Sequence, residues 1–562
     1  MPTILSRRAT HSVRAALLAL VLVSGAARHA GAQHPLSTLP LDDPAYQALA
    51  GLERLGCAPA RVSAFRPYYV GDVRSAITAM RADSSCPARL VRPLSGRFFA
   101  TEVRTLAPIR DSLLQRPDTL IPIAPDEPRL TGGAVADLAF TSLSKGEYRP
   151  LWRDVRPDSE GDPSLRASLR GRGTWSAGPR FVATSELWLE SNRRNDPQVR
   201  SKKLRDSGGF LDVSEAYMNG RLGPVIASFG RSNEAWLGEG RESLVLSAWG
   251  PSMDRALLSA RWSKVEARAM VSLLDDVVLD EALDSLAKGT GSVRLHRAFV
   301  AHAIAWRPIP RLEINAGETM LFTRRGAPVD FAYFNPLNPL VVVQNDTGRT
   351  GTEGRDNLVV FGGARAQVGS ATVEGELIVD DVQVDSKDAS RTAHQLGWSL
   401  AATAPLPVTM PANVRLAYRR IGSFTYSRGF YSETYQSYGV PLGSELGPDA
   451  RVIDAQLELW PSSALQFSGG AGQWLHGATR IDRRPSESPN FHAGEPFPSV
   501  RGARSAVQRA ITWNFGAQHV NQWFPVMARV EFARISNVNN QPGAAALYVR
   551  TVVGLRYAIR TP

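Results

Sequence analysis

The sequence predicts an all-β transmembrane barrel of about 18 antiparallel strands with a small N-terminal periplasmic α-helical module. Two observations lead to this prediction. From about residue 129 onward, segments of about ten residues alternate apolar and polar side chains, and an extended strand is the backbone that switches faces at every residue. The connections alternate between tight turns and long polar loops, because a membrane barrel places its short turns on one side and its long loops on the other.

The first 32 residues have the features of a secretory signal. A basic start is followed by an apolar run at 15–23 and by small residues at 30–32, where a signal peptidase cleaves, so the mature chain is expected to begin at Gln33. No later segment approaches the roughly 20 apolar residues that a membrane helix requires. An exported chain of this kind is periplasmic, secreted or an outer-membrane barrel, and the strand pattern favours the barrel.

The charge of the chain is basic and is carried mostly by arginine. The formal net charge is +12, and removal of the signal, which has four arginines and no acid, leaves +8. One interpretation is a GC-rich genome that encodes arginine in place of lysine. The other is functional, since guanidinium groups bind carboxylates and phosphates with two parallel hydrogen bonds. Nucleic acid is not an expected partner of an exported protein.

Residues 33–125 are expected to form the helical module. Asp43 followed by proline is an N-cap signal, and Gly56 ends the first helix. Apolar residues at helical spacing extend each helix, and the third is interrupted or kinked at Pro108. A proline-rich linker at 117–128 leads to the barrel. The predicted helices are 44–55, 70–80 and 98–114.

The only two cysteines, Cys57 and Cys86, both fall in this module. In an oxidising compartment they are expected to pair, closing a loop of about 30 residues and contributing about 3 kcal/mol. The alternative is two free thiols. A zinc site is not expected, because two thiols without clustered histidines are too few ligands.

The barrel is assigned to residues 126–562, and its strands are expected near 129–142, 164–176, 179–191, 212–222, 224–232, 254–262, 264–274, 291–306, 311–322, 357–368, 370–381, 391–403, 411–422, 450–460, 464–475, 504–518, 522–535 and 544–558. Glycine and proline mark the tight turns between them. With the module in the periplasm, the first strand runs outward and every long loop falls on the cell surface. These loops are 143–163, 192–211, 233–253, 275–290, 323–356, 423–449 and 476–503.

Strand arginines test the assignment, because an arginine facing lipid at mid-bilayer costs roughly 2–4 kcal/mol. In 544–558 the apolar residues lie opposite Arg550 and Arg556. Strand 291–306 departs from this rule, since Arg297 shares a side with its apolar neighbours, and a β-bulge is one interpretation. The polar inner faces predict a lumen filled or lined with water. A large soluble β-protein such as a propeller is the alternative, but no repeat of 40–50 residues supports it.

Motifs of catalysis are not found in the sequence. There is no nucleophile elbow, HExxH, Walker A loop or dinucleotide fingerprint, so neither an enzyme nor a cofactor is predicted. An acidic loop at 275–284 could hold calcium, but its spacing does not fit an EF-hand. A solvated acidic loop is the simpler interpretation, and no metal site is predicted.

Three stretches of the chain resemble the Wzi family of capsule-assembly proteins. They are STLPLDDP at 37–44 with SAFRPY at 63–68, GR at 230–231 with WLGEG at 236–240 and SLVLS at 243–247, and FNPLNP at 334–339. The resemblance implies a barrel of about this strand number, a periplasmic helical bundle and a non-catalytic surface role in retaining capsular polysaccharide. The expected partners are this polysaccharide, outer-membrane lipid and the barrel-assembly machinery.

A protein of this kind would bind sugar by stacking aromatic side chains on the rings and by bidentate hydrogen bonds. The arginine excess favours an anionic glycan as a hypothesis. The long loops supply the candidates Trp152, Arg153, Arg193, Arg194, Trp236, Arg241, Trp249, Arg324, Arg325, Tyr426, Tyr431, Tyr435 and Tyr438. The alternative for each aromatic residue is that it packs with the others to plug the barrel mouth. The competing class of protein is a porin or exporter, which the polar inner face fits equally well.

Overall fold

A computed structural model of the chain describes residues 34–41, 43–57, 60–99, 129–143, 164–191, 209–238, 243–280, 292–324, 331–344, 355–381, 395–427, 431–477, 479, 481, 507–519 and 526–560. The predicted signal and linker and most of the predicted third helix lie outside these residues.

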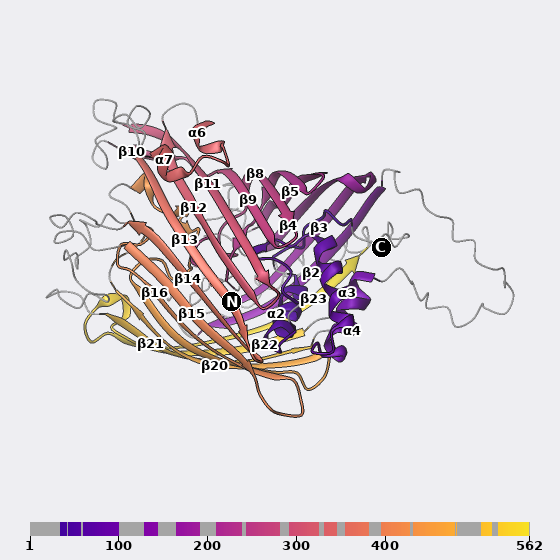
Figure 1. The fold of residues 1–562 in the computed structure, drawn as a ribbon. Coiled ribbons are helices and arrows are strands. Elements are labelled where there is room, and N and C mark those ends of the chain that lie inside the picture. The colour runs from indigo at the N-terminus through magenta and orange to yellow at the C-terminus, as the bar shows by residue number, and fades with distance from the viewer. Residues whose placement is uncertain are drawn as a thin grey trace, which may run out of the picture.

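Eighteen antiparallel strands form a closed barrel (Figure 1). Each strand pairs with the next one along the wall, and β23 returns to pair with β2. The strands are β2 (Arg129–Leu143), β3 (Ser164–Ala177), β4 (Phe181–Ser191), β5 (Gly209–Leu222), β6 (Val225–Ser232), β8 (Met253–Trp262), β9 (Val265–Leu273), β11 (Ser292–Ile309), β12 (Leu312–Arg324), β13 (Arg355–Val368), β14 (Ala371–Asp381), β15 (Gln395–Pro405), β16 (Ala412–Ile421), β19 (Ala450–Leu459), β20 (Leu465–His476), β21 (Gln508–His519), β22 (Val526–Ser536) and β23 (Ala545–Arg560).

All the predicted strands are present, with boundaries shifted by a few residues at most. The tight turns also fall where glycine and proline predicted them. Gly178, Gly223 and Gly369 each have a positive φ, at 59°, 59° and 62°, a conformation that favours glycine. A short extra strand, β10 (Val277–Asp280), pairs along the loop-side end of β11. The prediction of an antiparallel barrel of about 18 strands is therefore confirmed.

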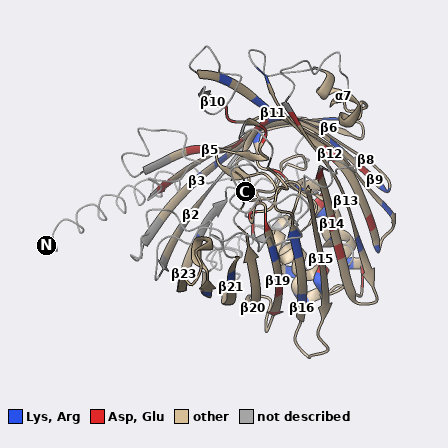
Figure 2. Ribbon diagram, turned by 90° about the vertical axis from the view of Figure 1, so that its left-hand side faces the viewer, with Lys and Arg blue, Asp and Glu red and all other residues tan. Residues whose placement is uncertain are grey.

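The outer wall is apolar, and charged residues interrupt many of the strands (Figure 2). In β23, Leu547 and Leu555 are 57% and 42% exposed, whereas Arg550 on the opposite face is 6% exposed. The predicted bulge at Arg297 is wrong, because β11 pairs with β12 in unbroken register from His296 to Trp306. Arg297 and its apolar neighbours of the same parity all face inward.

The helical module consists of α2 (Pro44–Arg54), α3 (Val70–Ala82) and α4 (Ala88–Phe99). The first two helices confirm the predictions, and the Asp43 side chain caps α2 by accepting the Ala45 N–H at 2.8 Å. The predicted disulfide is also present, with 4.6 Å between the Cα atoms of Cys57 and Cys86. Helix α4 was not predicted, because Pro93 in its interior is a helix-breaking signal.

The module has an apolar core of its own, formed by the inner faces of the helices around Leu49, Leu52, Val73, Ile77 and Leu94. It lies at the end of the barrel where the tight turns are (Figure 1). None of the helices in the described part of the chain has the length and hydrophobicity that crossing a membrane requires.

Candidate functional site

Three segments that are not barrel strands enter the lumen and fill part of it. We call them the N-terminal insert (residues 60–69), the first plug loop (233–250) and the second plug loop (422–449); residues 239–242 and 428–430 lie outside the described part of the chain. Their apolar side chains form one core with inward-facing residues of the wall. The fully buried members from these segments include Phe65, Trp236, Leu244, Val245, Leu246, Tyr426, Tyr435 and Leu442.

Aromatic side chains hold the three segments together. The rings of Phe65 and Trp236 meet edge to face with 5.4 Å between centroids, which joins the N-terminal insert to the first plug loop. In the second plug loop, Tyr426 and Tyr435 stack at 5.5 Å, and their hydroxyls donate to the carbonyls of Leu244 and Val245. Burial raises the pKa of Tyr435, so its phenol remains a neutral donor. The two tyrosines of the second plug loop thus stack on each other and also donate hydrogen bonds to the first plug loop, so the two loops hold each other in place.

Charged residues of the wall bind the plug through its backbone. The clearest case is Arg297, which is 2% exposed. Its guanidinium donates to the carbonyl oxygens of Ser432, Thr434 and Gln436 at 3.0, 2.8 and 2.8 Å, and it also pairs with Asp275 at 3.0 Å. One arginine therefore donates to three buried carbonyls of the second plug loop, of which that of Thr434 also accepts the Gln436 N–H at 2.7 Å.

Acidic residues of the wall bind backbone N–H groups in the same way. Glu376 accepts the Leu244 N–H at 2.9 Å, and Asp380 accepts the Tyr426 N–H at 2.7 Å. The inward charges that predicted a wet lumen thus face inward as expected, but around the plug they satisfy a folded backbone in a dry interior. For this part of the lumen the prediction of a water-filled interior is wrong.

A buried ion-pair network lies beneath the first plug loop. The Glu234 carboxylate accepts hydrogen bonds from Trp236 Nε1 at 3.2 Å and pairs with Arg255 at 2.7 Å and Arg268 at 3.3 Å. The Arg268 guanidinium also lies over the Phe65 ring, 5.2 Å from its centroid. Because a buried charge is costly without a partner, this arrangement requires the loop and the insert to be in place together.

The module closes the turn-side mouth of the barrel through ion pairs at its rim. Arg61 pairs with Glu313 at 2.8 Å, and Glu53 pairs with Arg365 at 2.8 Å. On β9, also next to its tight turn, Glu266 accepts a hydrogen bond from the Ser63 hydroxyl at 2.8 Å. These contacts join the module to several strands rather than to one.

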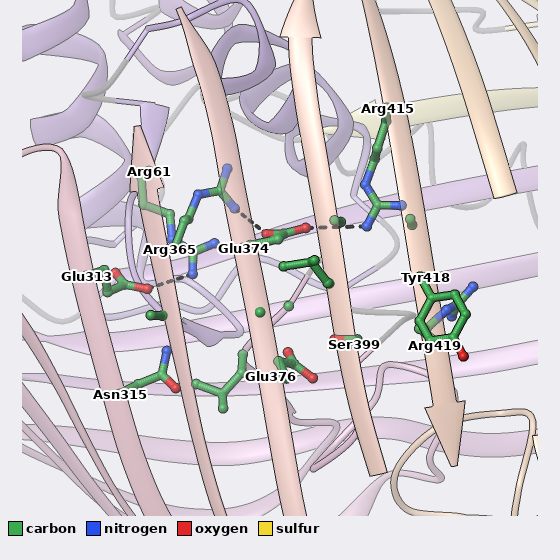
Figure 3. Close-up of a pocket in the computed structure, with 17 residues that line it drawn as sticks. Arg61, Glu313, Asn315, Arg365, Glu374, Glu376, Ser399, Arg415, Tyr418 and Arg419 are labelled. Atoms are coloured by element: carbon green, nitrogen blue, oxygen red, sulfur yellow. Dashed lines mark hydrogen bonds and ion pairs between the residues drawn. The ribbon is translucent and has the colours of Figure 1, made fainter. Parts of the chain in front are cut away.

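Two of the cavities in the described part of the chain are bordered by the module, the plug or the wall. Charged side chains that line the first cavity form a chain of ion pairs across β13, β14 and β16 (Figure 3). The Glu374 carboxylate pairs with Arg365 at 2.8 Å and with Arg415 at 3.3 Å, and so links the two arginines. The second cavity lies toward the turns, and both cavities are lined by Arg61, Glu313 and Arg365. The ion pair between Arg61 and Glu313 therefore borders both spaces.

The loop-side face of the plug carries an aromatic tip and an ion pair. Strands β17 (Gln436–Ser437) and β18 (Val440–Pro441) form a hairpin with Tyr438 and Gly439 at its turn, and Tyr438 is half-buried. At the loop-side ends of β6 and β8, Arg231 pairs with Asp254, whose side chain is 56% exposed. An aromatic ring near an exposed ion pair is an arrangement that can contact a sugar.

The structure separates the predicted ligand residues into several groups. Trp236 and Tyr435 are completely buried in the plug. They pack in its core and are not exposed to a surface ligand, contrary to the prediction. Arg324 lies on the outer wall, where it pairs with Asp356 at 2.7 Å, and is also corrected. Trp249 is half-buried, and Tyr431 begins the short turn η4 (Tyr431–Glu433). The candidates outside the described residues are Trp152, Arg153, Arg193, Arg194, Arg241 and Arg325.

The acidic loop that was considered for calcium has other contacts where it is described. Asp275 pairs with Arg297, and Asp276 accepts from His296 at 2.9 Å. Among the described residues, no three metal-ligating side chains form a group that could hold an ion. Sequence reasoning missed the anchoring roles of Arg297, Glu376 and Asp380, although the unusual parity of Arg297 was a signal of them.

A closed antiparallel barrel with an apolar exterior and a lumen filled from both ends is a plugged transmembrane β-barrel. The family described as capsule assembly protein Wzi matches residues 163–532, which is more than half of the chain. The chain belongs to this family.

Several solved structures are similar to this chain, and the first of them shows the same fold. Wzi of Escherichia coli, described as an outer-membrane protein involved in group 1 capsule assembly and a carbohydrate-binding β-barrel, has a TM-score of 0.58 and 11% identity over 92% of this chain and 99% of its own. OccD3 (OpdP) of Pseudomonas aeruginosa has a TM-score of 0.44 and 10% identity over 77% of this chain and 91% of its own. OprD of the same organism has 0.42 and 9% over 77% and 95%. No curated protein sequence matches this chain.

Proposed function

We propose that this chain is a non-catalytic outer-membrane protein that binds polysaccharide on its loop side and holds it at the cell surface. The observation that carries the proposal is the filled lumen of a member of the Wzi family. A barrel whose own loops and N-terminal module occupy its interior presents a surface to a large ligand, whereas a porin needs an open path. The carbohydrate binding described for the Escherichia coli protein supports the same role.

In this proposal the helical module lies in the periplasm and the long loops face outward. The N-terminal position of the module and its contact with the tight turns support this orientation, because short turns of outer-membrane barrels are periplasmic. The wall is in contact with outer-membrane lipid, and the barrel-assembly machinery inserts it. Tyr438 and Trp249 are the described aromatic residues of the plug loops that we assign to the ligand.

The test measures binding of surface polysaccharide from the source organism to the protein in detergent. Replacing Tyr438 with Ala is expected to weaken binding roughly tenfold, equivalent to about 1.4 kcal/mol. The matched control is Tyr418→Ala, which removes a tyrosine from a barrel strand rather than from the plug. Equal binding by wild type and Tyr438→Ala contradicts the assignment of that residue, and no binding by the wild type contradicts the function.

The hypothesis of an anionic glycan rests on the arginines of the long loops and has a separate test. Changing Arg193, Arg194 or Arg241 to Ala is expected to weaken binding more at low salt than at high salt, since salt screens exposed charges. Binding that does not respond to these changes removes the argument from arginine.

A solute or polymer pathway is the second candidate function, and the two cavities that share Arg61 and Glu313 are the observation that favours it. Single-channel conductance in a planar bilayer distinguishes the two candidates. The plugged lectin is expected to conduct poorly, whereas large and steady conductance by the intact chain supports a porin or exporter.

A further inference from the structure

A short helical segment packs against the outside of the barrel. We call residues 331–344 the wall flap; it contains α6 (Phe331–Phe334) and α7 (Leu340–Gln344) in the connection between β12 and β13 (Figure 1). Its buried residues Tyr333, Leu340 and Val343 form an apolar cluster with strand residues of β11 and β12. The strand members of this cluster are Ala298, Val300, Met320 and Phe322.

Strand parity shows that this cluster is on the lipid side of the wall. Ala298 and Val300 lie on the same face of β11 as Ile304 and Trp306. Those two residues are 55% and 47% exposed on the outer side of the barrel. Arg297, of the opposite parity, binds the plug inside. The wall flap therefore covers a part of the outer wall that would otherwise face acyl chains.

The wall carries polar groups that fit the flap. Glu318 shares the outward parity and accepts the Leu340 N–H at 2.8 Å, and its carboxylate also lies 3.5 Å from His302 Nδ1. Nearer the rim, the Tyr333 hydroxyl donates to Asp356, and its ring stacks on Phe322 with 4.7 Å between centroids. Polar groups on a lipid-facing wall are costly without partners, and the flap supplies those partners.

The position of Glu318 along its strand gives the depth of the flap. It lies six positions after Leu312, where β12 leaves the turn. At roughly 3.3 Å per residue this is about 20 Å of strand. With a strand tilt of about 40°, the carboxylate lies about 15 Å above the turn, within an apolar band about 25 Å tall.

The exposed residues of the flap are mostly apolar, with Asn335 as a polar member. Leu337 is 90% exposed, and Val341 and Val342 are 41% and 59% exposed. This surface continues the apolar exterior of the neighbouring strands, to which Ile314 and Val360 belong. We propose that the wall flap is embedded in the outer leaflet and that Leu337, Val341 and Val342 contact lipid acyl chains.

A spin label attached to Leu337→Cys, in protein reconstituted into phospholipid vesicles, tests this proposal. The two native cysteines are joined in a disulfide, so the introduced thiol is the only one available. The label is expected to collide more often with oxygen, which concentrates in acyl chains, than with a water-soluble nickel chelate. Ile304→Cys on the bare outer wall is the lipid-exposed control, and Asp254→Cys at the loop-side rim is the water-exposed control.

Two results would overturn the proposal. Preferential collision with nickel at position 337 places the flap above the membrane. Shielding from both reagents shows that a protein, such as a second copy of this chain, covers the surface instead. The double variant Glu318→Ala, Leu337→Cys tests the anchor, because release of Leu340 from Glu318 is expected to increase the mobility of the label, and unchanged mobility contradicts the anchoring role.

Discussion

The two ends of the barrel are closed by different structures. At the turn side, a helical module with its own apolar core and a disulfide docks onto the rim and sends one insert into the lumen. At the loop side, the closing segments are connections between barrel strands, and their apolar residues share one core with the wall. The first closure has a folded core of its own and joins the barrel through polar rim contacts and the apolar contacts of its insert, whereas the second is part of the barrel.

Because of this difference, we expect the stability of the two ends of the barrel to respond differently to mutation. The three helices of the module have internal packing that does not depend on the rim contacts, although the insert shares the core of the plug. The plug loops have no comparable core of their own, and their backbone depends on wall charges such as Arg297 and Glu376. We therefore expect changes at the loop side to affect the barrel, whereas changes in the module remain local.

The largest effect is expected from Arg297→Met. The change removes the guanidinium from three carbonyls of the second plug loop and from the Asp275 carboxylate. Thr434 retains the Gln436 N–H and Asp275 retains the Ser437 hydroxyl. Breaking a buried charge network costs about 3–5 kcal/mol. Denaturant titration should show a loss of that order, and protease should cut the second plug loop sooner.

Arg294→Met is the matched control for this prediction, because Arg294 lies on the same strand with a side chain that is 66% exposed. It is expected to change the free energy of unfolding by less than about 1 kcal/mol. If the two variants are equally stable, Arg297 does not hold the plug and the proposed dependence of the loop side on the wall is wrong.

The next effect concerns the module alone. Changing Cys57 and Cys86 together to Ser opens the loop that the disulfide closes and is expected to destabilise the module by about 3 kcal/mol. The module should become sensitive to protease while the thermal transition of the barrel stays in place. A matching fall in the barrel transition would show that the two closures are one cooperative unit.

The parts of this fold that the sequence predicted are those that depend on local signals. Strand positions follow from two-residue alternation, and turns such as Gly178 and Gly223 follow from glycine and proline at fixed places. The N-cap at Asp43 and the disulfide are likewise visible in short segments. Helix α4 was hidden because Pro93 contradicts the local preference, and its burial against α2 and α3 overrides that preference.

Whether the long loops lie inside or outside the lumen could not be predicted, because their position depends on contacts between residues far apart in sequence. Trp236 and Tyr435 are residue types that are common in surface ligand sites. Only their contacts with Phe65 and Phe299 show that they lie inside the barrel. The parity of Arg297 did carry this information. It was interpreted as a bulge because apolar neighbours were assumed to face lipid, whereas a dry plug makes the inner face apolar as well.

A smaller effect is expected from Arg61→Met at the module rim. The change removes the partner of the buried Glu313 carboxylate, which retains Arg307 at 2.7 Å. Loss of one buried charged hydrogen bond costs roughly 1.5–3 kcal/mol. Transient openings should become more frequent in single-channel records, while Arg89→Met on the exposed side of α4 should leave them unchanged. Records identical to the wild type would mean that this ion pair does not control the mouth.

The smallest effect is a dependence of module docking on pH through His34. Its Nε2 donates to the Gly178 carbonyl at 3.0 Å, and its Nδ1 accepts the Leu36 N–H, so the docked ring is neutral. Burial lowers the pKa of His34 below its usual value near 6.5. A free module therefore takes up a proton before the docked one does, and docking weakens as the pH falls through about 6.5.

The acidic residue Asp72 acts in the opposite direction, because burial raises its pKa and protonation at lower pH relieves the cost of docking the charged form. The comparison with His34→Gln separates the two contributions, since glutamine keeps a donor but does not titrate near neutrality. Protease cleavage of the module should increase between pH 7.5 and about 6 in the wild type and remain level in His34→Gln. The same increase in both proteins would assign it to a group other than His34, and not to Asp72, whose protonation acts in the opposite direction. The docked module would then be insensitive to the charge of His34.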